Sequence, residues 1–87
     1  MKQVTLVLKN DGGLHARPAS LFTKIASKFQ CRLKVVKEEK EVNPKSILSL
    51  LGMNARKGDS ITIIADGIDE NEAIKALQNL VENNFKE

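Results

Sequence analysis

His15, the only histidine, and Arg17 are the residues whose types and spacing could do chemistry in this 87-residue chain. A neutral imidazole is a nucleophile, and a guanidinium is a planar cation that can bind an anion through two parallel hydrogen bonds. Both stand in a stretch where Gly13 permits unusual backbone angles and Pro18 favours the first turn of a helix. We therefore expect a helix to begin at or just after His15.

The helix N-terminus expected beside His15 indicates which chemistry the histidine would perform. Free backbone amides and the helix dipole favour an anion there and disfavour an imidazolium. The amides of Ala16 and Arg17 would donate to the oxygens of a phosphoryl group held on the ring of His15. An exposed helix end stabilises an anion by only about 0.3–1 kcal/mol, so the group could be passed on. The segment predicts a phosphate-handling site, with a solvated surface histidine as the alternative.

The residues around His15 also match a longer pattern. They are Asn10, Gly13, Leu14, His15, Ala16, Arg17, Pro18 and Ala19. This pattern resembles the active-site signature of the HPr family, the histidine-containing phosphocarriers of the phosphoenolpyruvate-dependent sugar phosphotransferase system. The resemblance implies that Nδ1 of His15 accepts a phosphoryl group from phospho-enzyme I and donates it to the IIA domains of sugar permeases. It further implies a stoichiometric carrier, not an enzyme, that needs no cofactor or metal.

Length and composition restrict the class of protein. Eighty-seven residues predict one domain, 1–87, too small for a substrate cleft, so a partner must supply most of any active site. A net charge of +3 with no Trp or Tyr argues against nucleic-acid binding. No secretion signal or membrane-length apolar run is present, so we expect a cytoplasmic protein without membrane insertion. Cys31, the single cysteine, is expected to be a buried thiol on a strand.

Apolar periodicity predicts the elements that position His15. In chain order these are a strand at 4–8, a helix at 16–29, strands at 31–36 and 41–43, a short helix at 47–53, a strand at 61–65 and a helix after Asp69. Ser46 is the expected N-cap of the short helix and Asn54 its left-handed end. Asp69 and Glu72 suggest a capping box for the last helix.

The order of these elements, βαββαβα, predicts an α+β fold in two layers. One-sided helices and half-apolar antiparallel strands must bury their apolar faces against each other. This order agrees with the open-faced β-sandwich of the HPr family, in which a four-stranded antiparallel sheet carries three helices on one face. The resemblance therefore spans essentially the whole chain.

A partner protein would need an apolar patch beside the histidine with a charged rim. The candidate docking residues on the two helices and their flanks are Ser20, Lys24, Ser27, Lys45, Ile47, Leu48, Leu51 and Arg56. An apolar cluster at helical spacing is more often core than interface, so we expect Leu50 and one of its neighbours to be buried. Ile47 and Leu48 are the better exposed candidates. No long apolar edge calls for a second copy, so we expect a monomer.

Ser46 carries a second hypothesis besides helix capping, which alone is worth about 1 kcal/mol. Its context, 43–48, resembles the regulatory-serine region of HPr from low-GC Gram-positive bacteria. There an HPr kinase/phosphorylase modifies the serine, and the product is the corepressor of a catabolite control regulator. The resemblance implies a regulatory phosphorylation that adds about −1.5 to −2 charges. One alternative is a nitrogen-related paralogue that uses the histidine for regulation. A second is a regulatory protein like Crh, and His15 argues against it because members of that group lack the histidine.

Overall fold

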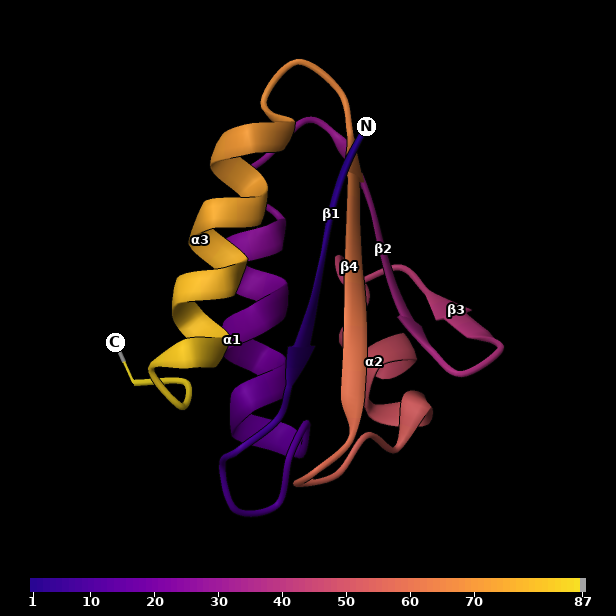
Figure 1. The fold of residues 1–87 in the computed structure, drawn as a ribbon, viewed down its shortest axis with the longest axis vertical. Coiled ribbons are helices and arrows are strands. Elements are labelled where there is room, and N and C mark those ends of the chain that lie inside the picture. Colours follow the sequence, from indigo (N-terminus) through magenta and orange to yellow (C-terminus); the bar gives the residue numbers. More distant parts are fainter. Residues whose placement is uncertain (87) are drawn as a thin grey trace.

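The computed structural model describes residues 1–86 and contains the elements in the predicted order (Figure 1). Their bounds are β1 Lys2–Val7, α1 Ala16–Ala26, β2 Arg32–Lys37, β3 Lys40–Val42, α2 Ile47–Met53, β4 Ser60–Asp66 and α3 Glu70–Glu82. The strands form one antiparallel sheet in the order β1-β4-β2-β3. The fold is the predicted open-faced α+β sandwich.

Alternation along the strands builds one buried face of the sheet. In β4 the side chains of Ile61, Ile63 and Ala65 are fully buried, whereas the residues between them are partly exposed. Val35 of β2 lies opposite Ile63 and continues the same buried face. Burying an apolar side chain of this size stabilises the fold by about 1.5–3 kcal/mol.

The helices cover that face. In Figure 1 α1 and α3 lie side by side, and α1 also packs against α2. The buried side chains of α1 are Pro18, Ala19, Phe22 and Ala26. Those of α3 are Ala73, Leu77, Leu80 and Val81, which confirms the predicted apolar face of the last helix.

α1 ends at Ala26, earlier than the predicted Phe29. The amide of Phe29 donates to the carbonyl of Ala26 (3.2 Å), three residues back, so a tighter turn follows the helix. Cys31 is buried, as predicted, but it precedes β2 and does not lie within the strand. Burial is the main cause that raises the pKa of its thiol to about 11.

The predicted capping box at the start of α3 is wrong. The Asp69 carboxylate makes no cap bond to its own helix; it accepts the amides of Gln30 (2.8 Å) and Cys31 (2.9 Å), before β2. Glu72 is exposed on the surface of α3. The hydrogen bond from Gln30 is the largest cause that lowers the pKa of Asp69. Asp69 therefore connects two segments that are far apart in sequence.

The structure confirms both residues that were predicted to end α2, Ser46 as its N-cap and Asn54 as its left-handed C-terminus. The Ser46 hydroxyl accepts the amide of Ser49 (3.3 Å), and Asn54 adopts the left-handed conformation (φ 56°) that ends the helix. Within residues 1–86 no helix has both the length and the apolar character needed to cross a membrane.

The role of Asp69 predicts an acid-dependent loss of stability. Its carboxyl pKa is lowered in the fold, so its contribution is complete above the unfolded value of about 3.9 and is lost as pH falls through the folded value. Thermal unfolding followed by circular dichroism from pH 7 to pH 2 should show Asp69→Asn with a lower Tm at pH 7 and a smaller loss in acid than the unmodified protein. Glu72→Gln serves as control and should change neither; equal effects of both substitutions would contradict the assignment.

Candidate functional site

His15 is the N-cap of α1, as expected from the sequence. Its backbone is extended (φ −84°, ψ −169°), its carbonyl accepts the amide of Ala19 (2.9 Å), and its side chain is exposed. Pro18 has no amide hydrogen, so the first-turn amides that no helical carbonyl accepts are those of Ala16 and Arg17. The structure thus places an exposed imidazole beside two amides and the positive end of a helix dipole.

The loop before His15 is held against the segment that follows α2. The Leu14 amide donates to the carbonyl of Ala55 (2.9 Å). Gly13 is buried with φ 60°, and a Cβ there would lie 2.5 Å from that carbonyl oxygen. The Asn10 side-chain amide donates to the Gly13 carbonyl (2.8 Å). A residue larger than glycine at position 13 would push the loop, and His15 with it, away from this segment.

Asp59 holds the neighbouring segment in place. Its carboxylate accepts the Arg56 amide (2.8 Å) and pairs with the Lys37 ammonium (3.1 Å). The hydrogen bond from the Arg56 amide is the first cause that lowers the pKa of Asp59, and the bond from Lys37 adds to it. The Asp59 amide donates to the carbonyl of Arg56, and the Asp59 carbonyl accepts the amide of Leu8, which precedes the loop that leads to His15. The backbone that supports His15 is therefore fixed from both ends of the loop.

One edge of the His15 imidazole lies close to Gly12. Gly12 has φ 81°, and a Cβ built on it would lie 2.6 Å from Cδ2 and 3.0 Å from Nε2 of His15. The ring edge formed by Cδ2 and Nε2 therefore backs onto the Gly12 backbone. Nδ1 is not among the three ring atoms nearest to that position, so of the two nitrogens it is the one farther from Gly12.

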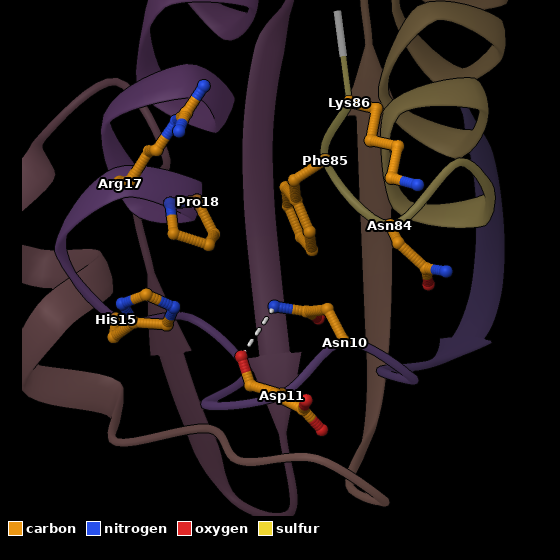
Figure 2. A pocket seen from close by; sticks show the side chains of 8 residues that line it. All are labelled: Asn10, Asp11, His15, Arg17, Pro18, Asn84, Phe85 and Lys86. Atoms are coloured by element: carbon orange, nitrogen blue, oxygen red, sulfur yellow. Dashed lines mark hydrogen bonds between the residues drawn. The ribbon is translucent and has the colours of Figure 1, made fainter.

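His15 and Arg17 line one hollow of the surface. The side chains around this hollow are Asn10, Asp11, His15, Arg17, Pro18, Asn84, Phe85 and Lys86 (Figure 2). In Figure 2 the guanidinium of Arg17 points away from the imidazole, along α1. The two groups share a hollow but do not contact each other, so the predicted contact of Arg17 with an anion on His15 requires rotation of its side chain.

A second hollow joins His15 to α2. It is lined by Gly12, Leu14, His15, Ala16, Leu51 and residues 54–57. Leu51 is 37 % exposed and belongs to an apolar patch with Ile47 (37 %) and Leu48 (78 %). Leu50 is fully buried, but its buried companion in α2 is Met53, so the expectation that one of these patch residues would be buried is wrong. All three residues of the apolar patch are exposed, and Leu51 connects the patch to the hollow at His15.

Two cations predicted for docking, Arg56 and Lys45, lie in different surroundings. Arg56 lines the second hollow. Lys45 is half-buried, and its ammonium donates to the carbonyls of Phe29 (2.7 Å) and Cys31 (3.1 Å). Its predicted role on a docking surface is therefore not supported, because those carbonyls occupy its hydrogen-bond donors. Sequence reasoning could not place the ammonium, because its acceptors lie in another loop.

Three of the predicted docking residues lie on α1 or at its end. Ser20 and Lys24 are exposed on the helix, and Ser27, its C-cap, is exposed at the end remote from His15.

Sequence reasoning missed the segment 84–86, which lines the hollow shared by His15 and Arg17. A phenylalanine after a predicted helix gives little indication of where the chain turns. Among residues 1–86 no cluster of three metal-ligating side chains occurs.

Comparison with known proteins agrees with this geometry. Residues 2–83 match the family model "PTS HPr component phosphorylation site". The chain is 46% identical over 85 residues to the phosphocarrier protein HPr of Mycoplasma genitalium, with 97% of each chain covered. It superposes on the crystal structure of HPr-C-His from Thermoanaerobacter tengcongensis with a TM-score of 0.97 at 48% identity, covering 100% of this chain and 98% of that one. Crh, the Bacillus subtilis catabolite repression containing protein, crystallised as a dimer with a swapped domain, is similar too (TM-score 0.77, 36% identity, 100% of each chain).

The contact between Gly12 and the imidazole predicts a specific effect of a single methyl group. Gly12→Ala and Gly58→Ala both place alanine at a positive φ, which costs about 1–2 kcal/mol of the free energy of unfolding. A Cβ at Gly58 has open space around it, whereas one at Gly12 meets the ring. Imidazole signals of His15 in NMR spectra should therefore shift in Gly12→Ala and stay in place in Gly58→Ala. Equal shifts in both variants would show that the contact does not orient the ring.

Proposed function

This chain belongs to the HPr family of phosphocarrier proteins of the phosphotransferase system, and we propose that Nδ1 of its His15 carries the phosphoryl group. The group is received from phospho-enzyme I and passed to IIA domains of sugar permeases. The observation that carries this proposal is the close approach of the Cδ2–Nε2 edge to Gly12, which leaves Nδ1 as the nitrogen farther from the loop on an exposed side chain at the N-terminus of α1.

The transfer step needs a free lone pair on Nδ1, which the ring has when its proton is on Nε2. The lone pair attacks phosphorus, a nitrogen–phosphorus bond forms, and the bond from phosphorus to the donor's leaving atom breaks with its electron pair. The phosphoryl oxygens then accept hydrogen bonds from the amides of Ala16 and Arg17. Rotation of the Arg17 guanidinium within the shared hollow adds a charge-assisted bond. These donors act on both the transition state and the product.

The surface around His15 supports docking of partners that complete the active site. The apolar patch of Ile47, Leu48 and Leu51 supplies area that a partner can cover, and Leu51 joins it to the hollow at His15. Arg56, which shares the second hollow with Leu51, and Arg17, which lines the first, favour acidic partner surfaces. Both hollows are open depressions, so the donor or acceptor protein must exclude water during transfer. The protein therefore acts as a stoichiometric carrier in a single domain, in the cytoplasm where those partners act.

Regulation at Ser46 is the second part of the proposal: an HPr kinase/phosphorylase phosphorylates Ser46. This residue is half-buried at the start of α2, immediately before Ile47 and Leu48 of the apolar patch. A phosphate would place about −1.5 to −2 charges at the edge of the patch. That charge opposes an acidic enzyme I and gives a basic catabolite control regulator a new contact.

The alternative function is that of a regulatory paralogue that acts mainly by binding partners, in nitrogen regulation or as a corepressor. The similarity to Crh at 36% identity supports this alternative. The exposed imidazole at the helix N-terminus favours the carrier, because binding alone does not require a nucleophile there. We propose a monomer, whose open sheet edges at β1 and β3 are short or rich in polar residues.

The carrier function predicts labelling that depends on His15. Incubation with labelled phosphoenolpyruvate and enzyme I should give an acid-labile label in the unmodified protein and none in His15→Ala, because no other described residue offers an imidazole. Arg17→Gln should be labelled at least about tenfold more slowly. Loss of a charge contact in the transition state raises the activation free energy by about 1.4 kcal/mol or more, and about 1.4 kcal/mol corresponds to a tenfold lower rate. Absence of label in the unmodified protein would refute the carrier function and favour the regulatory alternative.

The Ser46 proposal predicts an acid-stable label with ATP and HPr kinase/phosphorylase. Ser46→Ala should lose the label and about 1 kcal/mol of stability, because it also removes the helix cap. Ser49→Ala is the matched control, since it deletes the neighbouring hydroxyl, 3.1 Å from that of Ser46, and keeps the capping amide. Label that survives Ser46→Ala would assign the modification to another residue.

A further inference from the structure

The chain after α3 does not leave the protein surface; it turns back into the structure. Asn84 and Phe85 both have positive φ (54° and 61°), and Phe85 is only 5 % exposed. Its amide donates to the carbonyl of Leu80 (2.8 Å), and the Lys86 amide donates to that of Asn83 (3.2 Å). Two adjacent left-handed residues other than glycine cost about 1–3 kcal/mol each and persist only where the surroundings impose them. Burial of the Phe85 ring, worth about 1.5–3 kcal/mol, offsets part of this strain.

The position of this turn makes it a wall of the hollow that contains His15. In Figure 2 the ring of Phe85 stands between Pro18 of α1 and the side chains of Asn84 and Lys86. Lys86 and Arg17 both line this hollow, and they come from opposite sides of it. The acidic side chain of the hollow, Asp11, is paired with Lys57 (3.1 Å). Among the described residues that line the hollow, two are cations, and the carboxylate of Asp11 is partly neutralised by its ion pair. In Figure 2 the charged ends of both cations point away from the imidazole, so each side chain must rotate to reach an anion on His15.

We propose that Lys86 is a further anion-binding residue of this site, positioned by the buried Phe85. This inference rests on the proposed carrier function and goes beyond it: the phosphoryl group on His15 interacts with the ammonium of Lys86 as well as with the first turn of α1 and Arg17. An ammonium on a flexible stem acts as a point charge across the hollow. Phe85 is a positioning residue, since it touches neither the phosphoryl group nor His15 and acts by fixing where Lys86 leaves the backbone.

The charge of Lys86 is tested by the equilibrium of phosphoryl transfer between enzyme I and this protein. Lys86→Gln should shift the equilibrium toward phospho-enzyme I by about two- to fivefold at low salt, the range for an exposed charge pair. The difference should disappear near 1 M salt, where the screening length is about 3 Å. Lys86→Arg should behave as the unmodified protein. Lys28→Gln, with the same charge change beyond the other end of α1, should leave the equilibrium unchanged.

The positioning role of Phe85 is tested with the same readout. Phe85→Ala should reproduce the shift of Lys86→Gln and its salt dependence, and in Phe85→Ala the further substitution Lys86→Gln should add nothing. Phe85→Leu, which keeps a large apolar side chain, should leave the equilibrium close to that of the unmodified protein. If all variants are labelled and Lys86→Gln matches Lys28→Gln at low salt, Lys86 makes no contact and this inference is wrong while the carrier function stands. If the unmodified protein takes no label, the carrier function itself fails.

Discussion

The contact between the loop at Gly13–Leu14 and the segment at Ala55–Arg56 is the constraint on which the site depends. One amide-to-carbonyl bond of 2.9 Å and a glycine with no room for a Cβ join the start of α1 to the end of α2. The imidazole, the apolar patch and the first-turn amides belong to these two helices. Because the contact fixes the helices relative to each other, a nucleophile and a docking surface lie side by side without sharing any sequence neighbourhood.

Local signals in the sequence were sufficient for the parts of the site that depend on local structure. Pro18 at the third helical position and Ser46 before an apolar run predicted both helix starts, since capping and first-turn preferences involve neighbours within a few residues. Asn54 ended α2 for the same reason. The alternating strands predicted the buried face of the sheet. These features account for the fold class and for the place of His15.

Two of the predictions that failed concern polar side chains whose partners are remote in the chain. The carboxylate of Asp69 and the ammonium of Lys45 both bind backbone groups of the loop between α1 and β2. The amides and carbonyls of that loop need partners outside the helix and the strand, and sequence periodicity does not reveal which distant side chain will bind them. The orientation of the imidazole over Gly12 and the inward turn at Phe85 were also inaccessible, since each depends on positive φ angles stabilised by tertiary packing.

The account as a whole rests on the accessible nitrogen of His15. Phosphorus attached to Nδ1 would lie at the N-terminus of α1, where rotation of the Arg17 side chain brings the guanidinium to it. Phosphorus on Nε2 would be forced toward the backbone of Gly12. The most direct measurement is a ¹⁵N NMR spectrum of the protein labelled in its histidine ring and phosphorylated by enzyme I. We predict that the coupling to phosphorus appears at Nδ1, and coupling at Nε2 would contradict the account.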